Sequence, residues 1–350
     1  MQIHLPLIRR TVPLEAHRTD AMPASAILRK STARPITLVR IYFLRLVQRC
    51  PGMSNDDAAL PDRSEQPDLW QLSFHSLEEC RQALEANVPR FRARRAIEQE
   101  LQERLNTRDQ AILPGYCWVC RDVRAFTYDM RYSDGRRINW RERIVCPSCR
   151  LNNRLRLSVQ ILERLVEDTR PSIYLTEQVT PLASYIATRF PSATMSEYLG
   201  TEFSAGEVDA RGIRHENVTS LSFENETFDF ILSFDVLEHV PNYRAALAEL
   251  FRVLKPSGRI LISVPFGLLT DRNIVRARVN ADGRIEYLLP PEYHGNPVDP
   301  AGGILCYYHF GWEFLEELHP VGFTDAYVLL AWSLEFGHIG AEQVLIIGQK

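Results

Sequence analysis

Residues 221–266 of this chain read LSFENETFDFILSFDVLEHVPNYRAALAELFRVLKPSGRILISVPF, and this stretch decides the fold. The apolar run 228–234 has the length of a buried parallel strand. After the polar turn 235–242, apolar residues recur every three or four positions over 243–254, which predicts an amphipathic helix. Lys-Pro-Ser-Gly ends that helix, and the β-branched segment 259–264 predicts a second strand. A strand–helix–strand unit implies a parallel sheet with a ligand site at its carboxyl edge, where the polar turn lies.

This block resembles the second half of a class I, type-11-like S-adenosylmethionine-dependent methyltransferase domain. In that family the D-V-L-E-H-V turn lies over the methionine end of the cofactor, and L-K-P-S-G-R leads into the fifth strand. The resemblance covers about residues 172–350. It implies an α/β, Rossmann-like sheet of order 3-2-1-4-5-7-6, which the expected strands 323–330 and 343–347 would close as an antiparallel pair. The alternative is another doubly wound α/β domain, because one fold hosts many functions.

Charge is distributed unevenly along the 350 residues, whose net charge is −3. Residues 1–52 carry nine Arg or Lys against two acids. We interpret residues 1–67 as a poorly ordered basic extension and linker, with a targeting or nucleic-acid arm as the alternative. No run of 18 apolar residues and no secretory signal is apparent, so we expect a cytoplasmic protein without a membrane span. The expected domains are a helical segment (68–110), a small ribbon (111–156) and the methyltransferase domain (157–350).

Four cysteines form two C-x-x-C knuckles, Cys117/Cys120 and Cys146/Cys149, with 25 residues between them. Two such knuckles present four thiolates tetrahedrally, which predicts a structural Zn²⁺ site with no open position for water. Disulfides are the alternative, but the absent signal and three scattered further cysteines disfavour them. The intervening sequence suggests a hairpin around residues 133–135, as in a zinc ribbon.

The ribbon is rich in arginine, with ten Arg against four acids over residues 121–156. Arginine binds phosphate well, so this module could bind RNA, and Arg154 and Arg156 would then contribute. The alternative is a solvated surface crossed by ion pairs.

The turn after the expected first strand departs from the family pattern. This turn normally carries glycines that let the backbone approach the cofactor, but here it reads TEQVTP, residues 176–181. Thr176 and Glu177 would have to hold the cofactor's amino-acid end by another arrangement, or cofactor binding is impaired. Thr180 before Pro181 also suits a helix N-cap, which needs no ligand.

Further cofactor positions follow from the resemblance alone. Glu197 corresponds to the acid that binds the ribose hydroxyls, and Asn217 to the residue at the adenine amino group, with Val218 beside the ring. Ser233 and Phe234 end the fourth strand, next to the cofactor. Glu197 could instead be a surface residue, and Asn217 a turn residue.

The turn 235–242 supplies our catalytic candidates, Asp235, Glu238 and His239. We favour His239 as a base, since an ordinary histidine titrates near neutrality, although Glu238 and His239 could merely fix the loop. A lid-like insertion, 267–306, is expected over this edge of the sheet, with a hairpin around residues 281–283. Further candidate substrate contacts, each of which could equally be packing, are Tyr293, His294, Tyr308 and His309.

The first hypothesis is therefore a methyltransferase that uses S-adenosylmethionine to methylate an oxygen or nitrogen nucleophile of a small molecule or glycan. The second is an RNA methyltransferase whose ribbon binds RNA. The third is a non-catalytic binding protein that has lost cofactor affinity. The sequence leaves the acceptor and the oligomeric state open.

Overall fold

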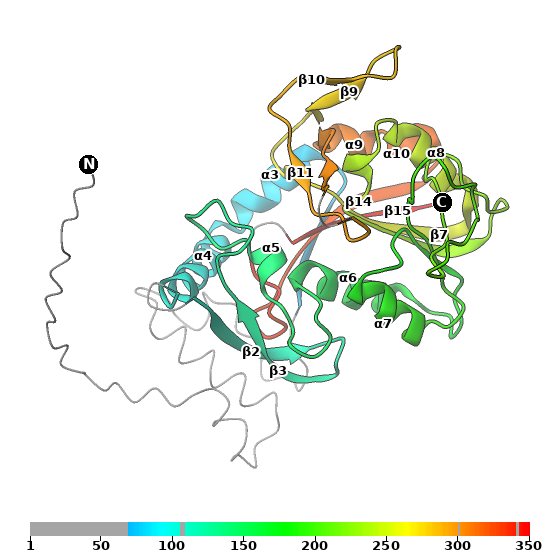
Figure 1. Ribbon diagram of the computed structural model, residues 1–350. Coiled ribbons are helices and arrows are strands. Elements are labelled where there is room, and N and C mark those ends of the chain that lie inside the picture. The colour runs from blue at the N-terminus through cyan, green and yellow to red at the C-terminus, as the bar shows by residue number, and fades with distance from the viewer. Residues whose placement is uncertain (1–68, 106–108, 300–301, 341–342) are drawn as a thin grey trace, which may run out of the picture.

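The computed structural model of the chain describes residues 69–105, 109–299, 302–340 and 343–350 (Figure 1). The basic extension predicted for residues 1–67 lies outside these ranges. Within them, no helix is both long and apolar enough to cross a membrane.

A seven-stranded mixed sheet forms the centre of the molecule, in the order β1-β14-β15-β7-β6-β4-β5. Four neighbouring strands are parallel, as the strand–helix–strand pattern predicted: β5 (Thr194–Met195), β4 (Ile173–Leu175), β6 (Phe228–Phe234) and β7 (Leu254–Ser263). The antiparallel part consists of β15 (Val344–Gln349), β14 (Asp325–Trp332) and β1 (Trp70–Phe74). The two C-terminal strands thus pair as expected.

The sheet differs from the expected order at both edges. The third strand of the family pattern is reduced, among the described residues, to an isolated parallel bridge between Glu197 and His215. At the other edge, β1 pairs antiparallel with β14, from Trp70 opposite Trp332 to Phe74 opposite Val328. The segment 68–110, which we expected to be helical, therefore begins with a strand of the main sheet. Its helical part is confirmed as α3 (Leu77–Ala86) and α4 (Val88–Glu103), broken next to Pro89.

Helices cover both faces of the sheet (Figure 1). α6 (Asn153–Leu165) and α7 (Pro181–Arg189) lie on one face; α3, α8 (Tyr243–Val253), α9 (Trp312–Glu316) and α10 (Leu318–Val321) lie on the other. Side chains alternate along each strand, so Ile231 packs into the core with Leu250 of α8, whereas Leu232 packs with Leu162 and Ile186. Each helix-covered face thus has its own apolar core.

The predicted helix of the 221–266 stretch is α8, and its two ends have local causes. Asn242 caps its first turn by accepting the Ala245 N–H at 3.2 Å. After the helix the chain turns directly into β7. A Cβ on Gly258 would lie 2.8 Å from the Lys255 carbonyl oxygen and 3.0 Å from that of Asp229, so glycine is required where the chain passes β6.

The cysteine module is a hairpin of β2 (Ala111–Cys117) and β3 (Asp122–Tyr128) followed by the short helix α5 (Trp140–Arg143). The paired strands β2 and β3 turn at the first knuckle, between Cys117 and Asp122, and the hairpin predicted around residues 133–135 is reduced to a single antiparallel bridge. After β3 the chain pairs with itself once more, through a single antiparallel bridge between Thr127 and Val145. Helix α4 packs on this module: Ile97 and Leu101 share a core with residues of β2 and β3 and with Trp332 of β14.

The segment after β7 forms three small two-stranded sheets. The hairpin predicted around residues 281–283 is confirmed as β9 (Ala277–Val279) and β10 (Ile285–Tyr287), which project from the body in Figure 1. The other pairs join β11 (Tyr293–His294) to β12 (Ile304–Leu305), and β13 (Tyr308–His309) to β8 (Ile274–Val275).

Candidate functional site

A cavity of about 1970 Å³ lies at the carboxyl edge of the parallel strands. The turns after β4, β5 and β6 form its floor, while the cysteine module and the segment after β7 add walls. The lining includes residues from 139–155, 176–181, 196–198, 216–219, 234–242 and 292–310. Parts of the chain that are distant in sequence therefore face one space.

The glycine-free turn after β4 is held by the acid that ends the next strand. Glu197 Oε1 accepts the backbone N–H groups of Gln178 at 2.7 Å and Val179 at 3.0 Å. Thr176 is buried, and its hydroxyl donates to the Leu232 carbonyl oxygen at 3.4 Å. Thr180 caps α7 through the Ala183 N–H, as predicted. Glu197 is thus a structural partner of the turn, and it also lines the cavity.

Glu177 presents a carboxylate without a hydrogen-bond partner for its buried Oε1. Burial raises the pKa of Glu177 to about 7, while Thr180 and Arg154 oppose this and Glu197 and Asp235 add to it. A buried acceptor of this kind normally has a donor. Because Glu177 lines the cavity, a cationic or N–H group of a ligand would supply one.

Of the residues expected around the adenine and at the end of the fourth strand, Asn217, Val218 and Phe234 line the cavity and Ser233 does not. Asn217 Oδ1 accepts from the N–H and hydroxyl of Thr219, at 3.0 and 2.8 Å, so the oxygen that we assigned to adenine closes a local turn. Val218 and Phe234 line the cavity. Ser233 is fully buried and is not among the lining residues, since alternation along β6 turns it away.

Asp235 is held by two arginines that the cysteine module and α6 supply. Its carboxylate receives both terminal nitrogens of Arg141, at 2.5 and 2.8 Å, and lies 3.2 Å from Arg154 Nη2. Ser263 donates to it at 2.9 Å. Burial alone would raise the pKa of Asp235, but the charges of Arg141 and Arg154 hold it well below the usual range. Asp235 is therefore an ionised anchor whose oxygens are engaged.

Neither arginine that we selected for RNA binding is available on the surface, which corrects that part of the sequence hypothesis. Arg156 is fully buried; it donates to the carbonyl oxygens of Phe336, Gly337 and Ile144 and lies over the Phe126 ring. The Arg154 side chain is 12% exposed and pairs with Glu142 and Asp235.

Glu238 and His239 lie in the 3₁₀ turn Leu237–His239 that follows β6. The Glu238 side chain is fully buried, and neither carboxylate oxygen has a hydrogen-bond partner. Burial, with the charge of Asp235, raises the pKa of Glu238 well above its usual range. His239 Nδ1 lies 2.8 Å from the Leu305 carbonyl oxygen. Burial lowers the pKa of His239, although that hydrogen bond opposes the shift, so the ring is neutral near pH 7.

The segment after β7 brings three further polar side chains to the same corner. His294 Nδ1 lies 3.2 Å from His239 Nε2, and His294 Nε2 lies 3.0 Å from Glu292 Oε1. His309 Nε2 contacts the same glutamate oxygen at 3.1 Å. Tyr293 lines the cavity, whereas Tyr308 is buried and donates to the Pro241 carbonyl oxygen. Glu292 and Arg141 were not predicted. Glu292 could have been noticed only as the acid before Tyr293–His294, and Arg141 only as one of the ten arginines of the ribbon.

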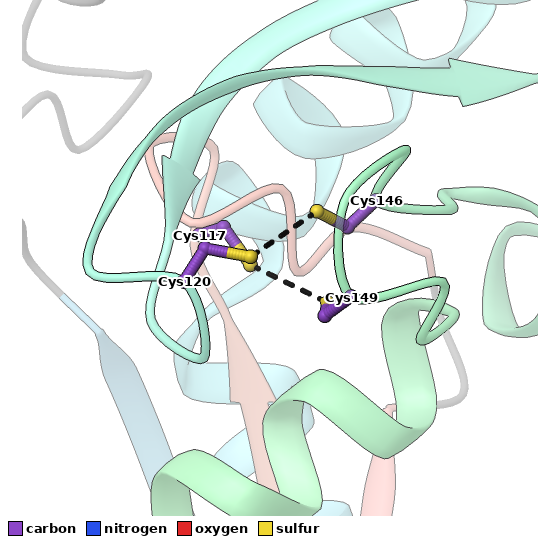
Figure 2. A group of neighbouring side chains, drawn as sticks. All are labelled: Cys117, Cys120, Cys146 and Cys149. Atoms are coloured by element: carbon purple, nitrogen blue, oxygen red, sulfur yellow. Dashed lines mark hydrogen bonds between the residues drawn. The ribbon is translucent and has the colours of Figure 1, made fainter. Parts of the chain in front are cut away.

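Four cysteine sulfurs converge at the hairpin turn of the module (Figure 2). Cys117 Sγ lies 3.8 Å from Cys149 Sγ, and Cys120 Sγ lies 3.7 Å from Cys146 Sγ. All four ligand atoms lie within 4.8 Å of one another. A tetrahedral ion with a metal–sulfur distance of about 2.3 Å separates its ligands by about 3.8 Å. The cluster thus has the spacing of a four-thiolate metal site, and all four cysteines are free thiols rather than disulfides.

The part of the chain that matches a known protein family is the part that forms the cavity floor. Residues 177–262 match the methyltransferase-domain family. This segment runs from the turn after β4 through β7, so it contains the cavity floor. The α/β fold and this match support a class I methyltransferase domain.

Individual relatives share only parts of their length with this chain. A demethylmenaquinone methyltransferase of Anoxybacillus flavithermus is 36% identical in an alignment of 77 residues that covers 19% of this chain and 32% of that protein. An uncharacterized protein of Methanocaldococcus jannaschii is 46% identical over 48 residues, 14% of this chain and 21% of that one. A solved S-adenosylmethionine-dependent methyltransferase of Methanosarcina mazei aligns at 16% identity and a TM-score of 0.33, over 54% of this chain and 96% of that one.

Proposed function

We propose that the chain is an S-adenosylmethionine-dependent methyltransferase that methylates an oxygen or nitrogen atom of a small molecule. The observation that carries this proposal is the cavity at the carboxyl ends of β4, β5 and β6, within the segment that matches the methyltransferase-domain family. In an open α/β sheet, ligands bind at this edge.

The cavity residues fit the cofactor without the usual glycines. Glu177 Oε1, which lacks a hydrogen-bond partner, would accept a hydrogen bond from the amino group of the cofactor's methionine end, beside Thr176 and the backbone that Glu197 holds. Glu197 uses Oε1 for the turn, which leaves its second oxygen for a ribose hydroxyl. Val218 and Phe234 would pack against the nucleoside, and Asn217 would shape that end as a turn residue. The bound cofactor supplies an electrophilic methyl group.

Catalysis by this chain would depend mainly on alignment, because methyl transfer is a displacement at a reactive centre. The wall formed by the insertion 267–306 would hold the acceptor and exclude water. His239 is our candidate for a base, because its ring is neutral and lines the cavity. Glu238 Oε1 lies 3.7 Å from His239 Nε2, and Asp235 would position Arg141 and Arg154 rather than accept a proton.

The cysteine cluster is proposed to hold a structural Zn²⁺ ion. Four thiolates leave no coordination position for substrate. Because α5 and its Arg141 lie between the two knuckles, the ion would fix one wall of the cavity. The ribbon would be a part of the active site's scaffold.

Calorimetry and product analysis test the proposal together. We expect the protein to bind S-adenosylmethionine, and Glu177→Gln to weaken binding; Glu167→Gln, an exposed acid outside the cavity, is the matched control. Incubation with labelled cofactor and pools of small molecules, glycans or RNA then identifies the acceptor. Absence of binding heat at millimolar cofactor would instead support the non-catalytic alternative.

A further inference from the structure

Three electron-donating atoms converge in the cavity corner where the 3₁₀ turn meets the insertion. They are Glu238 Oε1, His239 Nε2 and His294 Nδ1. The two ring nitrogens lie 3.2 Å apart, and each lies 3.7 Å from the carboxylate oxygen. The last two distances are too long for hydrogen bonds, and neither oxygen of the fully buried Glu238 has any hydrogen-bond partner. A buried carboxylate in this state takes up a proton unless a positive partner keeps it ionised.

The remaining hydrogen bonds determine which ring atoms carry protons. His239 Nδ1 faces the Leu305 carbonyl oxygen at 2.8 Å, and a carbonyl only accepts, so this nitrogen is protonated. His294 Nε2 faces Glu292 Oε1 at 3.0 Å, so a carboxylate orients the second ring in the same way. In neutral rings the lone pairs of His239 Nε2 and His294 Nδ1 then point toward each other, with Glu238 beside them.

From this arrangement we propose that Glu238, His239 and His294 bind a divalent first-row transition-metal ion. Such an ion lies about 2.0–2.2 Å from imidazole and carboxylate ligands, which in tetrahedral geometry places ligand atoms about 3.3–3.6 Å apart. The three observed separations bracket this range and need shifts of a few tenths of an ångström. Two histidines and one carboxylate with open positions are a set that binds Fe²⁺, Zn²⁺ and their neighbours.

The surroundings of the two rings match those of metal ligands. A ligating histidine usually donates its other ring N–H to a carboxylate or a backbone carbonyl, and here Glu292 and Leu305 occupy those places. Cys306 also lies near His294, but it is turned toward the Tyr308 carbonyl oxygen, at 3.2 Å. His239 and His294 line the cavity, so the vacant coordination positions face the space for an acceptor. The site shares no residue with the four-cysteine cluster.

The ion would change the role of His239. Its Nε2 would be a ligand and could not also accept a proton from the acceptor. Metal binding does not depend on methyl transfer, so the inference can be tested without S-adenosylmethionine, and its failure would leave the proposed function intact.

The test is a titration of Co²⁺ into full-length protein whose cysteine cluster has been filled with zinc. We expect one equivalent of Co²⁺ to bind with ligand-field bands but without thiolate-to-cobalt charge transfer, since the site has only nitrogen and oxygen donors. His294→Ala and Glu238→Gln should abolish these bands, and Glu292→Gln should weaken Co²⁺ affinity by about 10- to 100-fold. His319→Gln, at an exposed histidine outside the cavity, should retain them.

Two results would overturn the proposal. One is a wild-type protein that takes up no metal beyond the equivalent bound by thiolates, as measured by metal analysis. The other is unchanged Co²⁺ binding by His294→Ala. The zinc content of the cysteine cluster reports whether each variant is folded. If His294→Ala no longer holds this zinc, the proposal is judged from the metal stoichiometry of the wild type and from the Co²⁺ affinity of Glu292→Gln.

Discussion

The carboxylate of Glu197 accepts the backbone N–H of Gln178 at 2.7 Å, and thereby joins the end of β5 to the turn after β4. This turn has no glycine, so side chains and a charged acceptor determine its shape. The same acid lines the cavity, which couples the shape of the turn to any ligand that reaches it.

We expect Glu197→Ala to weaken S-adenosylmethionine binding by about 10- to 100-fold, because hydrogen bonds to a charged group contribute about 1.5–3 kcal/mol each. Glu197→Gln keeps a carbonyl acceptor for the two amides and should lose less. Calorimetric titration gives both dissociation constants. Glu202→Ala, an exposed glutamate outside the cavity, is the control, and an equal loss in this control would contradict the assignment.

The raised pKa of Glu177 predicts a dependence of stability on pH. Its folded-state pKa of about 7 lies above the ordinary value of 4.5, so its stabilising contribution is complete below pH 4.5 and is lost as the pH rises through 7. The free energy of unfolding of wild type should therefore fall, relative to that of Glu177→Gln, as the pH rises from 5 to 8. Urea denaturation at both pH values measures the difference. A constant difference between the two proteins would show that Glu177 titrates normally.

Asp235→Asn tests the ion pair between Asp235 and Arg141. We expect a loss of about 3 kcal/mol in the free energy of unfolding, near the lower limit for breaking a buried pair, because both side chains keep about a fifth of their exposure. Asp235 has a backbone φ of 54°, which asparagine tolerates, so the substitution changes mainly the charge. Asp271→Asn, at an exposed pair, should change stability by less than about 1 kcal/mol. Equal effects at the two positions would argue against the paired arginines.

Replacement of Cys146, one of the four proposed zinc ligands, should affect both stability and the cavity. We expect Cys146→Ser to lower the melting temperature by about 10 °C or more, since a structural zinc site contributes several kcal/mol and each kcal/mol shifts the midpoint by roughly 2–4 °C. S-adenosylmethionine binding should weaken as well, because Arg141 lies between the knuckles. Metal analysis, thermal melts and calorimetry make the three measurements. Cys80→Ala, a buried cysteine outside the cluster, should keep its zinc and its cofactor affinity.

Features with a local cause could be predicted from the sequence. The helical period over residues 243–254 gave α8, the pair Thr180–Pro181 gave the cap of α7, and the knuckle spacing gave the cluster of four sulfurs. The hairpin around residues 281–283 could also be predicted, because its turn residues lie next to one another in the sequence. The hairpin around residues 133–135 keeps only one bridge, because the short helix α5 occupies most of its expected second arm.

Features that join distant segments could not be predicted. Arg141 and Asp235 are 94 residues apart. Asn217, which we assigned to adenine, lines the cavity, and its oxygen also accepts from Thr219 in a local turn. Ser233 was placed in the cofactor site by its position at the strand end, whereas the alternation of β6 buries it. In each case the partner of a polar side chain depends on packing that residue spacing does not encode.

Residue spacing was sufficient to predict α8, the parallel order of the central strands and the four-cysteine cluster, because side-chain period, turn chemistry and ligand spacing act over a few residues. Only the tertiary structure decided that β1 closes the sheet against β14, that Arg141 reaches Asp235, and that His294 faces His239 across 55 residues. The physical reason is that burial and charge pairing select among many long-range partners only once the chain is compact.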